Sequence, residues 1–137
     1  MKVEPFPYSI EITVEAPLYH SEDEEKVRKA IENIFLNVEV TKEAGKPTNL
    51  IAVGKGAKTL HIVYQQLRAR QVLGVARRLL LEHVTDDSTW LYLNKQAAFV
   101  GIVSICEEWG ESPLGPIKIT IKCQQMKEFI DWLTPST

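Results

Sequence analysis

Cysteine is scarce in this sequence, which excludes two common ways of holding a small fold together. Cys106 and Cys123 are the only cysteines among 137 residues, and neither has the close cysteine or histidine spacing of a zinc site. Both lie in strand-like runs, so we expect buried, reduced thiols in preference to a disulfide. A chain of this length buries roughly two thirds of its surface on folding. We therefore predict one domain over 1–137 that needs no metal and no cofactor.

Long apolar runs are also missing. The apolar stretches are short and interrupted, and the first residues, MKVEPFPYS, contain no basic region, no extended apolar region and no small-residue cleavage site. A membrane-spanning helix needs about 20 consecutive apolar residues. The sequence therefore predicts a soluble, cytoplasmic protein that is neither secreted nor inserted in a membrane.

The compact motifs of common enzymes are absent as well. The three histidines, His20, His61 and His83, are far apart, and no His-Glu-x-x-His, Gly-x-Ser-x-Gly or glycine-rich dinucleotide motif occurs. The best catalytic alternative is an acid/base cluster of His20 with Glu22 and Asp23. We predict that the protein is not an enzyme.

One stretch, AVGKGAKTL at 52–60, is similar to a phosphate-binding loop without matching it. Lys58 and Thr59 stand where that motif places its lysine and hydroxyl. The two glycines that let backbone N–H groups surround a phosphate are replaced by Ala52 and Ala57. We therefore expect no useful nucleotide affinity at this loop.

Hydrophobic periodicity predicts a mixture of strands and helices. Strict alternation over 8–16 and 117–123 indicates strands that are buried on one face only. Further strands are predicted at 38–41, 49–53, 89–93 and 98–107, and helices at 21–35, 59–84 and 126–133. These elements predict an α+β fold of two layers: a mostly antiparallel sheet of five or six strands with three helices packed on one face.

The ends and phases of the two longer helices add detail. Ser21 and Glu24 fit a capping box, which predicts Ser21 as the N-cap of the first helix. In the second helix the apolar stripe from Leu60 to Leu67 does not share a phase with the stripe from Leu73 to Leu80. We therefore expect a bend near 68–73.

Charge is strongly segregated, although the whole chain has a formal net charge of only −2. Residues 55–85 hold six lysines and arginines against one acidic residue, whereas residues 1–54 hold six against ten. The six basic side chains are Lys55, Lys58, Arg68, Arg70, Arg77 and Arg78. On the predicted long helix they fit the capture of RNA phosphates. The alternative is a solvated face whose arginines pair with the acidic first third of the chain.

A second polar group is predicted at the turn that follows 89–93. Asn94, Lys95 and Gln96 would stand at a hairpin tip, where they fit contacts to RNA phosphate or sugar. A need for solubility produces such a tip too, and it is the simpler explanation.

The predicted sheet surface suggests two further interpretations. Glu11 and Glu15 on one strand face Lys118 and Lys122 on another if the two strands are neighbours, which predicts cross-strand ion pairs. The tryptophans lack the interleaved basic residues of single-strand binding surfaces, so we interpret them as lids over the core. They are Trp90, Trp109 and Trp132.

Several motifs together resemble one known family. They are SEDEEKVRKAIENIF (21–35), LRARQVLGVARRLL (67–80), LYLNKQAAFVG (91–101), LGPI (114–117) and FIDWLTPST (129–137). This set, spread over nearly the whole chain, is similar to the archaeal uncharacterised protein family (UPF) two-hundred-and-one. The resemblance implies a fold like that of large-subunit ribosomal protein L-five, an archaeal cytosolic setting and RNA binding.

The sequence favours a non-catalytic, RNA-binding or ribonucleoprotein-associated domain that uses the basic face of the 59–84 helix. The alternative is a homodimeric interaction module in which that face meets the acidic first third of a second copy. An enzyme with scattered acid/base residues is the third hypothesis.

Overall fold

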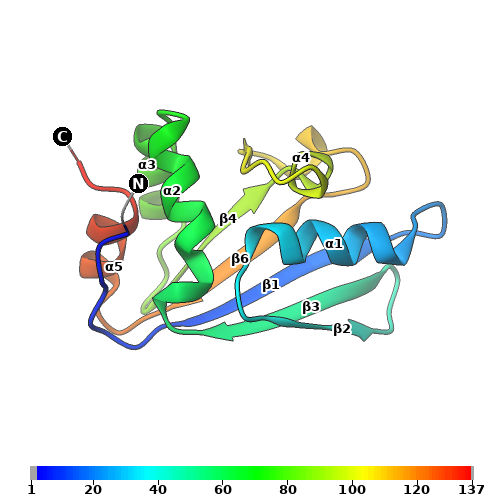
Figure 1. Cartoon of the computed structure of the whole chain (residues 1–137), viewed down its shortest axis with the longest axis horizontal. Helices are drawn as coiled ribbons and strands as arrows, with labels where there is room; N and C mark the ends of the chain where they lie inside the picture. Colours follow the sequence, from blue (N-terminus) through cyan, green and yellow to red (C-terminus); the bar gives the residue numbers. More distant parts are fainter. Residues whose placement is uncertain (1–2, 137) are drawn as a thin grey trace.

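One antiparallel sheet forms the base of the fold in the computed structural model, which describes residues 3–136 (Figure 1). Its strands are β1 (Glu11–Leu18), β2 (Glu39–Glu43), β3 (Thr48–Lys55), β4 (Ser88–Leu93), β5 (Ile105–Cys106) and β6 (Ile117–Lys122). They lie in the order β2-β3-β1-β6-β4-β5, and all neighbours pair antiparallel. The predicted α+β class is confirmed.

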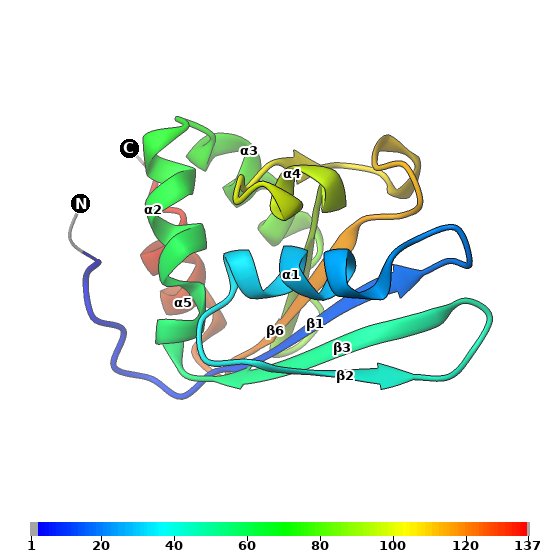
Figure 2. The ribbon, with the colours of Figure 1, turned by 45° about the vertical axis from the view of Figure 1, so that its right-hand side comes forward.

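The helices lie on one side of this sheet and leave its other face open (Figures 1 and 2). The α-helices are α1 (Glu24–Ile34), α2 (His61–Ala69), α3 (Leu73–Glu82), α4 (Lys95–Phe99) and α5 (Met126–Leu133), with 3-10 turns η1 (Ala57–Leu60) and η2 (Trp109–Glu111). Helix α1 runs along the strands, whereas α2, α3 and α5 gather at one end. The helix count exceeds the predicted three because one predicted helix is divided and one predicted turn is helical.

Strand β1 shows the predicted alternation. Ile12, Val14 and Ala16 are fully buried beneath the helices, and Thr13 and Glu15 point to the open face. Because every second residue of β1 is apolar, only the face that carries these residues can pack on the core. The same rule orients β6 and β4, so the open face of the sheet could be predicted residue by residue.

Helix α1 buries the predicted side chains but begins later than predicted. Asp23, not Ser21, is the N-cap, and its carboxylate accepts the N–H of Glu25. The predicted capping box does not form because Glu24 binds Lys42 and Arg28 instead.

The predicted helix over 59–84 is two helices. Helix α2 ends at Ala69, Gln71 takes a positive φ of 58°, and α3 begins at Leu73. The bend predicted near 68–73 is a full break, so its place is confirmed and the predicted continuity of the helix was wrong. Each segment turns its own apolar stripe to the core, and a straight helix cannot bury both stripes.

The predicted hairpin turn after β4 is also wrong. Asn94 is the N-cap of α4, where its side chain accepts the N–H of Ala97. The strand predicted over 98–107 is reduced to Ile105–Cys106. Asparagine favours both turns and N-caps, so the local sequence does not separate the two structures.

Both cysteines are buried and free, as predicted. Burial raises the pKa of the Cys106 thiol and that of the Cys123 thiol. Within residues 3–136, no helix has the length and apolar character needed to cross a membrane.

Candidate nucleic-acid interface

Arg68, predicted to bind phosphate, instead joins α2 to the end of α5. Its Nη1 donates to the carbonyls of Tyr64 at 3.1 Å and Leu133 at 3.2 Å, and its Nη2 donates to the Trp132 carbonyl at 2.9 Å. The guanidinium carbon lies 3.3 Å from the centroid of the Tyr64 ring. Burial lowers the pKa of this guanidinium. Arg68 therefore satisfies carbonyls that the C-terminus of a helix leaves unpaired.

Arg77 makes a second contact to the same helix end. Its Nη1 donates to the Thr134 carbonyl at 2.8 Å and lies 2.9 Å from Oδ1 of Asp131. The hydrogen bond from Arg77, followed by one from Lys127, lowers the pKa of the Asp131 carboxyl. Arg68 and Arg77 together hold the C-terminal helix against α2 and α3.

Arg78 is exposed and pairs with two carboxylates. Its Nη2 lies 2.9 Å from Oε1 of Glu107, and its Nη1 lies 3.3 Å from Oε1 of Glu82. Hydrogen bonds with Glu107 and then Glu82 raise the pKa of this guanidinium. The carboxylate partners of the helix arginines, Glu82, Glu107 and Asp131, thus all come from the later part of the chain. The expected pairing with the acidic first third of the chain was wrong.

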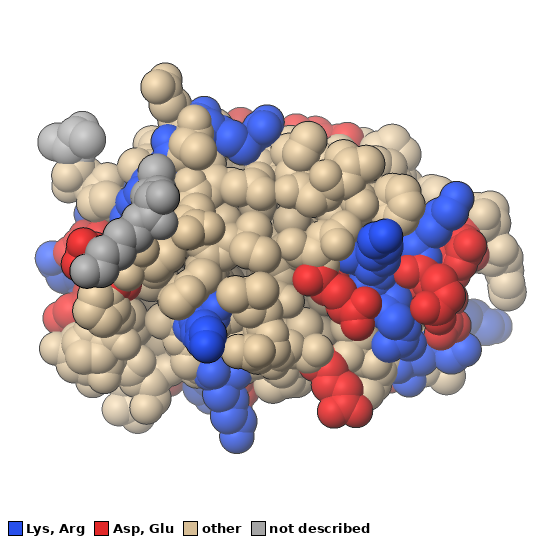
Figure 3. Space-filling model, in the orientation of Figure 1, with Lys and Arg blue, Asp and Glu red and all other residues tan. Residues whose placement is uncertain are grey.

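Lys55, Lys58 and Arg70 form the accessible remainder of the basic segment. All three side chains are exposed, and none enters an ion pair within the described part of the chain. The face in Figure 3 shows lysines and arginines in separate groups divided by wide uncharged areas, and the group on the right is mixed with carboxylates. On this face, charge is scattered and forms no continuous basic surface.

The stretch 52–60 is packed in a way that opposes phosphate binding. A Cβ added at Gly54 would lie 2.6 Å from the Thr59 hydroxyl oxygen, so that hydroxyl fills the space beside the glycine. Thr59 itself is buried. The hydroxyl that a phosphate-binding loop presents to its ligand is therefore part of the packing here.

Lys95 is buried, and the predicted exposed tip does not exist. Its Nζ donates to the carbonyls of Pro17 at 2.6 Å and Leu114 at 2.7 Å and lies 3.0 Å from Oε2 of Glu22. Burial lowers the pKa of the Lys95 ammonium, whereas its ion pair with Glu22 opposes that shift. The three ammonium hydrogens have three protein partners.

The neighbours of Lys95 are also engaged. Asn94 caps α4, and Gln96 donates to the carbonyl of Pro113 at 2.9 Å. The predicted trio of phosphate or sugar contacts is therefore a structural group that joins α4 to the end of β1, the loop after β1 and the loop before β6.

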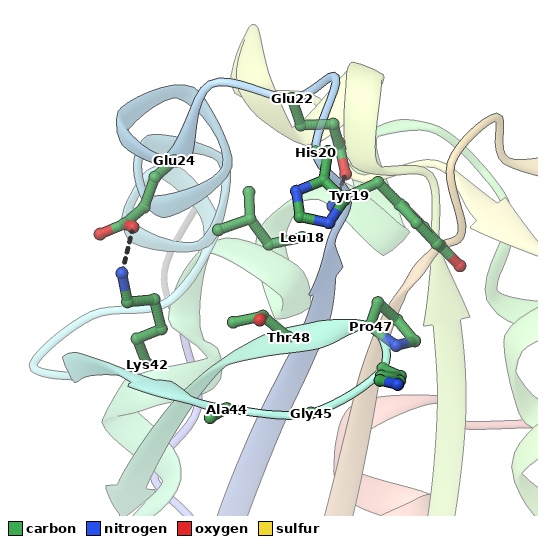
Figure 4. Close-up of a pocket in the computed structure, with 11 residues that line it drawn as sticks. Leu18, Tyr19, His20, Glu22, Glu24, Lys42, Ala44, Gly45, Pro47 and Thr48 are labelled. Carbon is green, nitrogen blue, oxygen red and sulfur yellow. Dashed lines mark hydrogen bonds and ion pairs between the residues drawn. The ribbon is translucent and has the colours of Figure 1, made fainter.

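A pocket of about 780 Å³ lies between the start of α1 and the β2–β3 hairpin (Figure 4). Leu18, Tyr19 and His20 come from the end of β1 and the loop after it, and Lys42 reaches Glu24 at 3.0 Å across the opening. The hydrogen bond from Lys42 lowers the pKa of the Glu24 carboxyl despite some opposing desolvation.

Two residues of the catalytic alternative, His20 and Glu22, line this pocket, whereas Asp23 does not. Glu22 binds Lys95 and the N–H of Tyr19, and Asp23 caps α1. Over residues 3–136, no three histidine, cysteine or acidic side chains are grouped closely enough to hold a metal ion. The carboxylates beside His20 in sequence are thus occupied with holding the loop and the helix.

The open face of the sheet brings together residues that are distant in sequence. Strands β1 and β6 are neighbours, as predicted, with Glu11 opposite Lys122 and Glu15 opposite Lys118. Within the described residues these cross-strand neighbours do not approach to ion-pair distance. Both lysines therefore keep their ammonium groups outside carboxylate pairs.

An aromatic row crosses the same face along β4. The His83 and Trp90 rings stack with centroids 3.5 Å apart, Trp90 and Tyr92 lie 4.7 Å apart, and Tyr92 meets Trp109 edge to face at 5.9 Å. Lys118 on the adjacent strand places its Nζ 5.1 Å from the Trp90 centroid. Sequence reasoning missed this combination because the lysine comes from a neighbouring strand.

The tryptophans fall into two groups. Trp132 packs with Phe6, Tyr64 and Phe129, so its interpretation as a core lid is confirmed. Trp109 is 46% exposed, and for this residue the same interpretation was wrong. Trp90 is half-buried between neighbouring side chains of the open face.

Comparison with known proteins places these features in a family. A family model described as RNA binding matches residues 11–123. A UPF0201 protein of Methanopyrus kandleri is 43% identical over 130 residues, which cover 88% of this chain and 81% of that protein. Another, of Pyrobaculum calidifontis, is 39% identical over 130 residues, covering 93% and 90%. The crystal structure of a UPF0201 protein from Methanococcus jannaschii aligns with a TM-score of 0.78 at 30% identity, covering 93% and 94% of the two chains. The chain belongs to the UPF0201 family, whose relatives in these comparisons are archaeal.

Proposed function

We propose that this protein binds RNA without catalysing a reaction on it. The observation that carries the proposal is the RNA-binding family model, which matches residues 11–123 and so includes the whole sheet, α2 and α3. The absence of a compact catalytic motif in the sequence agrees with a binding role. A cytoplasmic location and a likeness to ribosomal protein L-five, which the family resemblance implies, belong to the same proposal.

Phosphate contacts are assigned to Lys55, Lys58 and Arg70. These side chains are exposed and lie outside the ion pairs of the described chain, so binding RNA breaks no internal interaction. Arg78 is exposed too, but it must share its guanidinium with Glu82 and Glu107. Arg68 and Arg77 shape this surface by holding α5, and their hydrogen bonds are already made.

The homodimer alternative loses part of its basis. It needed helix arginines that are free to meet an acidic face of a second copy, and Arg77 and Arg78 find carboxylates within their own chain. Lys55, Lys58 and Arg70 alone offer a second copy little charge. RNA, with one phosphate at every nucleotide, suits widely spaced cations better.

The salt dependence of binding tests the proposal. Each lost phosphate contact lowers the slope of log affinity against log salt by about 0.7 for single-stranded RNA and about 0.9 for a duplex. The triple variant Lys55→Ala/Lys58→Ala/Arg70→Ala is expected to lower the slope by about three times the value for one contact. It should keep its fold, because exposed charges contribute little to stability. Fluorescence anisotropy at several salt concentrations measures the slope.

Lys29→Ala is the matched control, since Lys29 is an exposed lysine on α1, away from the basic segment. It is expected to leave the slope nearly unchanged. If the folded triple variant binds as the wild type does, these three residues are not phosphate contacts. If the wild type binds neither RNA form, the proposed function is wrong.

A further inference from the structure

The open face of the sheet offers a row of aromatic rings. Trp90 and Tyr92 alternate on β4 with buried Leu91, so both rings stand on the face that carries no helix. His83 from the end of α3 and Trp109 from η2 extend this row on its two sides. Four rings from three separate chain segments thus lie side by side along β4.

Trp109 is held on one side and open on the other. A Cβ added at Gly115 would lie 2.9 Å from Cζ2 of the indole, and Gly115 itself takes a φ of +82°. The absence of a side chain at Gly115 therefore allows both the positive φ of the turn and the close contact with the indole ring. Because the indole is already held in place, its side chain loses little conformational entropy when a flat ligand stacks on the exposed side.

Positive charge follows the row on the adjacent strand. Lys118 lies over the Trp90 ring, and Lys122 stands four residues further along β6 on the same face. The carboxylates near Trp109 are already engaged: Glu107 pairs with Arg78, and Glu111 accepts the N–H groups of Glu107 and Glu108. Glu11 and Glu15 also stand on this face, on the neighbouring strand β1, directly opposite Lys122 and Lys118.

A groove of about 660 Å³ continues from the end of this face. Its lining includes Tyr8, the cations Lys55 and Lys122, and the carboxylates Glu11 and Asp87. The rings on β4 do not line the groove, and Lys55 opposes Glu11 across β3 and β1. The stacking proposal therefore rests on the rings of β4 and their neighbours and not on this groove.

We propose that the open face formed by Trp90, Tyr92, Trp109 and Lys118 binds unpaired RNA bases by stacking. The inference rests on the proposed RNA-binding function and adds the form of RNA, because only an unpaired base exposes a ring face to an aromatic side chain. Aromatic stacking next to lysines that contact the backbone is the chemistry of sequence-tolerant single-strand binding. A paired duplex presents phosphates to the lysines and keeps its bases away from the rings.

The test compares a short single-stranded uridine oligonucleotide with an RNA duplex of matched length. Trp109→Ala is expected to weaken binding of the single strand about tenfold or more and to change binding of the duplex little. Trp109→Phe retains a ring and is expected to recover most of the lost affinity. The single strand should also quench the tryptophan fluorescence of the wild type, with a smaller quench in Trp109→Phe.

Val100→Ala is the control for loss of exposed apolar surface, because Val100 is 66% exposed at the end of α4 on the helical side. Circular dichroism checks that every variant is folded. Should Trp109→Ala fail to fold, Lys118→Gln provides the test, with an expected loss of about 0.7 in the salt slope for the single strand.

The outcomes separate the two proposals. If the wild type binds RNA but the folded Trp109→Ala variant binds the single strand equally well, stacking is wrong and the proposed function stands. Loss of all RNA binding by the wild type overturns both. Two other results would assign this face to another partner. One is a neutral oligosaccharide that binds as tightly as the single strand, and the other is a dimer that the Trp109→Ala substitution dissociates. Either result overturns the stacking proposal alone.

Discussion

At the scale of single residues, Lys95 shows how burial changes the meaning of a charge. Its side chain is 4% exposed, and that of Glu22 is 7% exposed. The ammonium contacts carbonyls at the end of β1 and in the loop before β6, and the N–H of Lys95 donates to Ser112. A buried ion pair adds little net stability by itself, but removal of one partner leaves the other charge without compensation.

Lys95→Met is therefore expected to destabilise the protein by about 3–5 kcal/mol, because it leaves the Glu22 carboxylate and two carbonyls without their donor. The double variant Lys95→Met/Glu22→Gln removes both charges and should recover part of that loss. Urea unfolding followed by circular dichroism measures both. Lys29→Ala, a change at an exposed residue of α1, serves as the control, and a loss below about 1 kcal/mol for Lys95→Met would show that the charge pair is not structural.

At the scale of elements, the junction of α2, α3 and α5 depends on hydrogen bonds from arginines to the end of one helix. Arg68 lies in the last turn of α2 and donates to carbonyls in the last turn of α5. The chain then leaves the helical path at Gln71, and α3 begins in a new direction that allows Arg77 to reach the same helix end. The break between α2 and α3 thus brings two arginines to one set of carbonyls.

Arg68→Ala is expected to cost about 2–3 kcal/mol of unfolding free energy, since the charged donor is lost and the α5 carbonyls stay partly buried. Arg70→Ala, two residues away and exposed, should change stability by less than about 0.5 kcal/mol. Thermal or urea unfolding of the two variants gives the comparison. Similar losses in both variants would contradict the assignment of Arg68 to packing and Arg70 to the surface.

At the scale of the whole molecule, the buried thiols report on opening of the fold. Cys106 lies on the edge strand β5, whereas Cys123 directly follows the inner strand β6. Burial raises the pKa of each thiol, so the reactive thiolate is rarer than in an unfolded chain at the same pH.

Reaction with a thiol reagent is therefore expected to be slow in the native protein and fast in denaturant. Because an edge strand opens more readily than an inner one, Cys106 should react before Cys123 at low denaturant. The Cys106→Ser variant retains only the Cys123 thiol, and the Cys123→Ser variant retains only the Cys106 thiol, so each variant gives one of the two reaction rates. If Cys106 and Cys123 react at equal rates at every denaturant concentration below the unfolding transition, both thiols are exposed only by global unfolding.

Much of the fold could be predicted because its signals are local. The two-residue period of β1 and β6 fixed their inward faces, and the stripe of α1 fixed its buried side. The start of α4 could not be predicted, because Asn94 suits a turn and an N-cap equally.

Much of the candidate site depends on tertiary contacts, which periodicity does not encode. Exposure of Lys55, Lys58 and Arg70 agrees with the sequence prediction, and their role in RNA binding stays a prediction. Lys95 and Glu22 are 73 residues apart, and Lys118 reaches Trp90 only through the pairing of β6 with β4. The sequence predicted the basic segment but not which of its cations are already bound within the chain.

The strand order has a consequence for synthesis of the protein. Strand β1 is made first, and its neighbours in the sheet are β3 and β6, the last strand of the chain. A nascent chain that emerges from the ribosome can form the β2-β3-β1 half of the sheet, but one edge of β1 stays unpaired until Ile117–Lys122 has been made. Domains generally fold as units during translation, and unpaired strand edges favour aggregation. The centre of this sheet is therefore completed only after β6 has been made, and until then the growing chain exposes the edge that β6 will cover.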